Sequence, residues 1–89
     1  MNTYQSLFKK IKIGQVEISN RIIQGPATTN FAGPNGEIIP QILEYYRVRS
    51  AGGPGLVITE ACFVSKEAKA WPRQIGVDRD ELIPGLRQL

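Results

Sequence analysis

The chain has 89 residues, of which 42% are hydrophobic and 21% are charged, and it contains six prolines. These values are typical of a globular protein and suggest neither a disordered nor a fibrous chain. The net charge of +3 comes from scattered Lys and Arg residues, which argues against the clustered basic face that binds nucleic acid. With one cysteine and no histidine, the chain offers neither a disulfide framework nor a zinc site of its own.

No targeting or membrane segment is recognisable in the sequence. The first residues lack a positive segment followed by an apolar one, and no apolar run approaches the roughly 18 residues of a membrane span. We therefore expect a cytoplasmic protein without a membrane partner.

Alternating apolar residues near the start of the chain predict a β-hairpin. Ile11 and Ile13 form one pair and Val16 and Ile18 the other, with Gly14-Gln15 suited to a two-residue turn between them. A lone two-stranded hairpin is barely stable in water, so we expect it to cover part of a larger fold.

The next apolar stretch, Arg21-Ile22-Ile23, predicts the first core strand. It is short and β-branched, as expected of a strand that is buried on both faces. Residues 25–38 are rich in Gly, Pro, Asn and Thr and predict a long loop.

A helix and a second strand follow this loop. The helix is predicted to begin at Pro40 and to run for about 12 residues, because Ile42, Leu43 and Tyr46 follow helical spacing. Gly52-Gly53-Pro54-Gly55 ends it, and residues 56–64 predict a second strand, parallel to the first. Strand, helix and strand in this order form a β-α-β unit.

The last part of the chain predicts a long loop after Val64 and then the opening turns of another helix from Ile83 onward. Two parallel strands and one helix cannot cover each other, so we expect further strands from sequence beyond Leu89 or from another chain. An open sheet and a (β/α)8 barrel would both serve. In a barrel of about 250 residues, residues 1–89 would be the N-terminal fragment of a single α/β domain, with the hairpin capping the N-terminal mouth.

In both architectures ligands bind at the carboxyl ends of the strands, which makes residues 25–30 and 59–63 the candidate sites. The hydroxyls of Thr28 and Thr29 can donate or accept hydrogen bonds, and Gly25-Pro26 lets the backbone approach a planar ligand closely. A flat heteroaromatic molecule would suit this loop. The alternative is that these side chains only satisfy their own backbone.

Glu60 and Cys62 lie at the end of the second strand. Glu60 could act as a general base, but with no histidine nearby we favour a structural role, as an ion pair with an arginine or an acceptor for loop amides. Cys62 is expected in the core. We assign no catalytic or metal-binding residue, and no glycine-rich phosphate motif of the Rossmann or P-loop type occurs.

Four segments in order, "LFKKIKIGQVEISNRII", "GPATTNF", "EYYRVRSAGGPGLVITEA" and "QIGVDRDELIPGLRQL", resemble the N-terminal part of the old yellow enzyme family of NADH:flavin oxidoreductases. The resemblance extends from Leu7 onward. Among branches it is most similar to the 2,4-dienoyl-CoA reductase type.

The resemblance implies an FMN-dependent (β/α)8 barrel that transfers hydride from NAD(P)H through the flavin to an activated C=C bond of a small alkene or enone. Pro26, Ala27 and Thr28 match positions that contact the flavin, with Thr28 near its O4 and N5 atoms. Ala61 matches a small residue beside the pyrimidine side of the flavin. Asn30 and Phe31 match loop positions on the substrate side.

Other functional parts of the family would lie beyond Leu89: the donors for the substrate carbonyl, the proton-donating tyrosine, the flavin-phosphate ligands and any iron–sulfur cysteines. We therefore expect the isolated 89 residues to be inactive. The alternative is a non-catalytic remnant that serves as a structural or interaction module, whereas a flavin-free barrel enzyme is disfavoured by the motif order. Homo-oligomerisation, the substrate and the choice between NADH and NADPH stay open.

Overall fold

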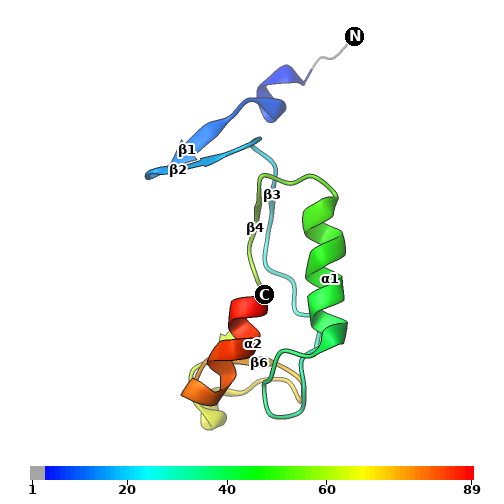
Figure 1. Cartoon of the computed structure of the whole chain (residues 1–89), viewed down its shortest axis with the longest axis vertical. Coiled ribbons are helices and arrows are strands. Elements are labelled where there is room, and N and C mark those ends of the chain that lie inside the picture. Colours follow the sequence, from blue (N-terminus) through cyan, green and yellow to red (C-terminus); the bar gives the residue numbers. More distant parts are fainter. Residues whose placement is uncertain (1–3) are drawn as a thin grey trace.

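The computed structural model describes residues 4–89. A parallel pair of strands with one helix beside it forms the middle of the chain, with the hairpin at one end and the C-terminal elements at the other (Figure 1). The carboxyl ends of the two strands point toward the C-terminal elements.

The predicted hairpin is confirmed. Strands β1 (Ile11–Ile13) and β2 (Val16–Ile18) are antiparallel, with Ile13 opposite Val16. Gly14, at the first turn position, has φ +61°, a backbone conformation that costs glycine little. The hairpin lies at the amino end of the middle strands (Figure 1), where the sequence predicted a cap.

The predicted β-α-β unit is also confirmed. Strands β3 (Ile23–Gln24) and β4 (Leu56–Val57) pair in parallel, with Ile23 opposite Leu56 and Gln24 opposite Val57. Helix α1 (Pro40–Ala51) connects them and begins at the predicted proline. After the helix Gly53 has φ +112°, which turns the chain back toward β4.

One side chain fastens the amino ends of this unit. Asn20 Nδ2 donates to the carbonyl of Gly53 at 2.7 Å, and its Oδ1 accepts the amides of Ile22 at 3.0 Å and Gly55 at 2.7 Å. Gly55 also lies so close to the Asn20 backbone that a Cβ would approach its carbonyl oxygen within 2.4 Å. The start of β3 and the glycine-rich turn before β4 are therefore held in register.

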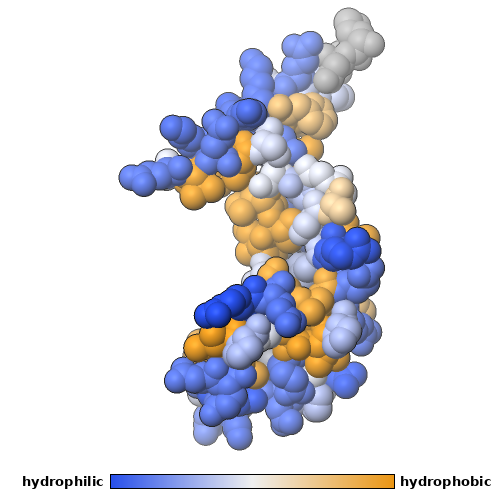
Figure 2. Space-filling model, in the orientation of Figure 1, coloured by the Kyte–Doolittle hydropathy of each residue, from blue (hydrophilic) through white to orange (hydrophobic). Residues whose placement is uncertain are grey.

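The prediction that residues 21–23 are buried on both faces is wrong for this structure. Ile22 and Ile23 are 39% and 48% exposed, and Ile58 is 43% exposed. Within residues 4–89, β3 pairs with β4 alone, so no further strand or second helix layer covers them. Figure 2 shows the resulting apolar surface over the middle of the chain.

The prediction of one strand over 56–64, and of a loop after it, needs correction. The predicted strand is divided into β4 and β5 (Cys62–Phe63), and the buried Glu60 lies between them. Strand β6 (Ile75–Gly76), inside the predicted loop, pairs in parallel with β5. The predicted final helix is present as α2 (Ile83–Gln88).

The core lies between α1, β6 and the loop after β3. Its buried residues are Ala32, Ile42, Tyr46 and Ile75. Gly76 permits this packing, because a Cβ there would approach Phe63 Cζ within 2.6 Å. Neither helix within residues 4–89 has the length and apolar character needed to cross a membrane.

Candidate functional site

The loops that leave β3 and β4 run side by side at the carboxyl ends of these strands. The amide of Ile58 donates to the carbonyl of Gln24 at 3.0 Å, which extends the parallel pairing by one bond. Further along, the amide of Thr29 donates to Glu60 Oε2 at 3.1 Å. Hydrogen bonds therefore join the two loops at two places, next to the strands through Gln24 and Ile58, and further along through Thr29 and Glu60.

A buried carboxylate organises this place. Glu60 is only 2% exposed, and its Oε1 accepts the hydroxyls of Thr29 at 2.8 Å and Tyr46 at 3.0 Å. In return, the amide of Glu60 donates to the Tyr46 hydroxyl oxygen at 2.8 Å. A buried carboxylate with this many donors is well stabilised without a cationic partner. The predicted hydrogen bond to a loop amide is confirmed, and within residues 4–89 no arginine pairs with Glu60.

Burial and the carboxylate of Glu60 raise the pKa of two residues at this place. Burial raises the pKa of Tyr46 to about 12, and the carboxylate of Glu60 also disfavours the phenolate. Burial, followed by the charge of Glu60, raises the pKa of the Cys62 thiol. Cys62 Sγ donates to the carbonyl of Glu60 at 3.3 Å and lies against the core, as the sequence predicted.

The residues predicted to contact a flavin are Pro26, Ala27, Thr28 and Ala61, and all four are exposed. Thr28 precedes Thr29 and Ala61 follows Glu60 in the chain, so the bonds between Thr29 and Glu60 bring the two loops together. The described part of the chain provides no hydrogen-bond partner for the amides of Ala27 and Thr28 or for the Thr28 hydroxyl.

The residues predicted on the substrate side have structural partners. Asn30, with φ +59°, accepts the amide of Arg73 on its Oδ1 at 2.7 Å. Phe31 is half-buried and meets the Tyr45 ring edge-on, with 6.0 Å between ring centroids. Asn30 is nevertheless exposed at the surface, next to the loop of Thr28.

Two residues of the site were not found from the sequence. Tyr46 was placed on the apolar face of the helix, although a carboxylate at the end of an apolar strand does imply a hydroxyl or amide donor nearby. Gln74, 4% exposed, donates from Nε2 to the carbonyl of Ala61 at 3.3 Å and accepts the amide of Ala70 at 2.7 Å. No sequence signal indicated Gln74, because a single glutamine in a loop has no periodicity.

These groups fit a flat heteroaromatic cofactor such as FMN. Two free amides and one free hydroxyl can pair with ring nitrogens and carbonyl oxygens, and the small side chains of Ala27 and Ala61 leave room for a ring system. No group of three or more metal-ligating side chains occurs within residues 4–89.

Known proteins are similar to this chain in sequence and in fold. Residues 6–89 match the model of the NADH:flavin oxidoreductase / NADH oxidase family. A metal reductase of Desulforamulus reducens is 40% identical over 83 residues, which make up 93% of this chain and 12% of that protein.

Two solved structures superimpose closely on the chain. A 2-naphthoyl-CoA reductase in complex with 2-naphthoyl-CoA has a TM-score of 0.93 at 31% identity, covering 97% of this chain and 13% of that one. The old yellow enzyme homologue of Zymomonas mobilis has a TM-score of 0.84 at 31% identity, covering 93% and 23%.

The chain thus spans less than a quarter of each of these proteins. The structural matches confirm the predicted fold class, the N-terminal part of a (β/α)8 barrel. By the family match over residues 6–89, the chain belongs to the NADH:flavin oxidoreductase / NADH oxidase family.

Proposed function

We propose that these residues form one wall of the FMN site in an oxidoreductase that uses NAD(P)H to reduce an activated C=C bond or a related acceptor. The observation that carries the proposal is the set of free donors at the carboxyl ends of β3 and β4. Bound FMN would supply the hydride chemistry, accepting a hydride from NAD(P)H and passing it to the substrate. The protein residues bind and orient the reacting partners.

Each loop residue has a role in this proposal. The Thr28 hydroxyl donates a hydrogen bond to a ring nitrogen or carbonyl, which stabilises negative charge there. Pro26 and Ala27 fix the direction of the backbone against the ring plane, and Ala61 keeps the adjacent space open. Asn30 and Phe31 lie on the substrate side, held in place through Arg73 and Tyr45.

The resemblance to the 2,4-dienoyl-CoA reductase branch suggests a substrate class. The TM-score is 0.93 with 2-naphthoyl-CoA reductase and 0.84 with the old yellow enzyme homologue. We propose that the acceptor is a small conjugated alkene or enone carried as such or as a thioester. A cytoplasmic location stays a prediction.

We further propose that the 89 residues alone do not reduce alkenes. The free donors lie at the carboxyl ends of a strand pair, and the apolar residues Ile22, Ile23 and Ile58 in and beside these strands are exposed. The rest of a ligand cavity is therefore not formed by residues 4–89. The measurement is FMN titration of the isolated chain, in which we expect no saturable binding at micromolar FMN.

The direct experiment is purification of the full-length gene product, followed by its absorption spectrum and release of flavin by acid. We expect a yellow protein with about one FMN per chain. A colourless protein that takes up no FMN would contradict the proposal and favour the non-catalytic structural or interaction module.

Thr28→Ala tests the role of the hydroxyl. Loss of one hydrogen bond is worth about 1 kcal/mol, or roughly 20 mV for a two-electron couple, so we expect a lower flavin potential and slower reduction by NAD(P)H. Ser19→Ala, which removes an exposed hydroxyl near the hairpin, is the control. Identical potentials and reduction rates in Thr28→Ala and wild type would remove Thr28 from the site.

A further inference from the structure

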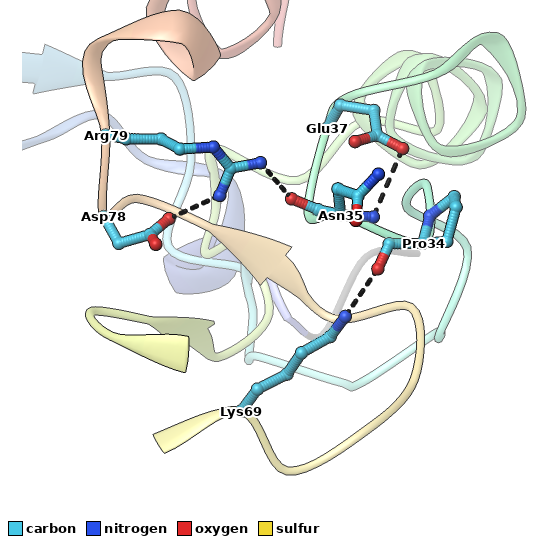
Figure 3. A network of polar contacts seen from close by, with 6 residues as sticks. All are labelled: Pro34, Asn35, Glu37, Lys69, Asp78 and Arg79. Carbon is cyan, nitrogen blue, oxygen red and sulfur yellow. Dashed lines mark hydrogen bonds and ion pairs between the residues drawn. The ribbon is translucent and has the colours of Figure 1, made fainter. Parts of the chain in front are cut away.

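A pocket of about 410 Å³, separate from the proposed flavin site, lies beyond the carboxyl ends of β5 and β6. We call it the Lys66 pocket; its lining residues are Asn35, Glu37, Phe63, Lys66, Lys69 and Arg79. None of the proposed flavin contacts lines it. Figure 3 shows polar contacts at this pocket, where side chains from two loops converge on the turn formed by residues 33–37.

Two cations hold this turn over the strands. Lys69 Nζ donates to the carbonyl of Pro34 at 2.6 Å, and Arg79 Nη2 donates to the carbonyl of Asn35 at 2.5 Å (Figure 3). Lys69 also lies over the Phe63 ring, with Nζ 5.6 Å from the centroid. Phe63, 3% exposed, gives the pocket an apolar wall that does not compete for these charges.

The cations keep more donors than the protein uses. Lys69 uses one of its three N–H donors, on Pro34, and Arg79 uses two of its five, on Asn35 and Asp78. Lys66 is exposed, and its side chain has no hydrogen-bond or ion-pair partner within residues 4–89.

The charge of the pocket is also unbalanced. Its lining has three cations, Lys66, Lys69 and Arg79, against one carboxylate, Glu37. Glu37 accepts the amide of Asn35 on its Oε1 at 3.3 Å, so part of its acceptor capacity is already occupied. A second carboxylate, that of Asp78 outside the lining, forms an ion pair with Arg79, with Oδ1 3.0 Å from Nη1.

We propose that the Lys66 pocket binds a phosphate or pyrophosphate group of the substrate or cosubstrate. Such groups present several charged oxygens, which match lysine and arginine donors in number and sign. In (β/α)8 barrels the phosphate of a bound cofactor usually lies at the loops after strands seven and eight, so this pocket is a separate place. Two phosphate-bearing molecules could supply the group, a coenzyme A thioester and the nicotinamide nucleotide.

The test is calorimetric titration of inorganic pyrophosphate into the flavin-loaded, full-length protein. Saturating flavin keeps its own phosphate site filled, so a failure of flavin binding and a failure of this pocket are observed separately. We expect saturable binding in wild type that weakens as salt is added. Absence of saturable binding in wild type would overturn the proposal.

Variants then assign the binding to the pocket. Lys66→Ala should weaken pyrophosphate binding about tenfold, or ~1.4 kcal/mol, without affecting the fold, because the Lys66 side chain has no hydrogen-bond or ion-pair partner among residues 4–89. Glu37→Gln, which keeps an oxygen acceptor for Asn35, should tighten binding about threefold. Lys12→Ala, in the exposed hairpin, is the matched control and should have no effect. Equal affinity in Lys66→Ala and Lys12→Ala would overturn the assignment.

Competition distinguishes the two sources. Adenosine 3′,5′-bisphosphate represents the coenzyme A end, and 2′-phosphoadenosine diphosphate ribose represents the NADPH end. Displacement of pyrophosphate by either supports the pocket and identifies the source. Displacement by neither would restrict the site to inorganic phosphates and overturn its role toward substrate or cosubstrate.

Discussion

Tyr46→Phe removes one oxygen atom from the centre of the site. In the wild type this hydroxyl donates to Glu60 Oε1 at 3.0 Å and accepts the amide of Glu60 at 2.8 Å. The phenyl ring fills the same space in the core, so no cavity forms. The change therefore isolates the two hydrogen bonds.

The expected loss follows from the two partners. A hydrogen bond to a charged group contributes about 1.5–3 kcal/mol, and a buried amide left without an acceptor costs about 1–3 kcal/mol. Because Thr29 still donates to the same carboxylate, we expect a sum near the lower end, about 3 kcal/mol. That is a large share of the 5–15 kcal/mol typical of a domain.

The assay is hydrogen exchange of the peptide that contains the Glu60 amide in the full-length protein, together with urea denaturation. A loss of about 3 kcal/mol accelerates exchange on the order of a hundredfold when exchange reports the opening equilibrium. Tyr45→Phe is the matched control. The Tyr45 hydroxyl has no hydrogen-bond partner within residues 4–89, and its ring contacts to Phe31 and Tyr46 remain in phenylalanine.

Equal exchange rates in the Tyr46→Phe and Tyr45→Phe proteins would refute the view that Glu60 and Tyr46 hold the two loops together. A collapse of the fold in both variants would instead assign the effect to the aromatic cluster and would refute it equally.

Three other predictions concern single residues. The pKa of Tyr46 is raised from 10.0 to about 12, so between these pH values the unfolded state loses a proton that the folded state keeps. The free energy of unfolding, measured by urea denaturation, should therefore fall as the pH rises through this range, and Tyr46→Phe should lessen the fall. Gly36→Ala should lower the free energy of unfolding by about 2–4 kcal/mol, because Gly36 has φ +86° and a Cβ would lie 2.8 Å from the amide nitrogen of Gly76. Gly14→Ala, at φ +61° with open space around it, should lower it by only about 1 kcal/mol. Similar melting temperatures of the two variants would contradict this prediction. Asn30→Ala removes the hydrogen bond to the Arg73 amide and places alanine at φ +59°, which asparagine tolerates better, so it should destabilise the protein by about 1–2 kcal/mol. In thermal unfolding it should be less stable than Asn30→Gly, and the reverse order would contradict this role of the Asn30 backbone.

Local sequence signals predicted the elements that have strong periodicity or a clear boundary. The hairpin follows from period-two alternation around Gly14, and α1 follows from Pro40 and the spacing of Ile42 and Tyr46. The rule that ligands lie at the carboxyl ends of parallel strands also predicted a site at the loop of Thr28, and this loop does follow the carboxyl end of β3.

Tertiary contacts decided the rest. Strands β5 and β6 have two residues each, too few to show a period, and they pair across the chain with Phe63 opposite Gly76. Burial on both faces of residues 21–23 was wrong because exposure depends on which neighbours pack against a strand. The hydroxyl of Tyr46 was missed because helical spacing reports only that a residue faces inward, not what its polar atom contacts.

The most direct measurement is a crystal structure of the flavin-loaded, full-length protein. We predict that β3 and β4 remain adjacent and parallel, with the flavin ring against Pro26, Ala27 and Thr28 on one side and beside Ala61 on the other. A flavin bound away from these loops, or an antiparallel arrangement of the two strands, would contradict the assignment of this site.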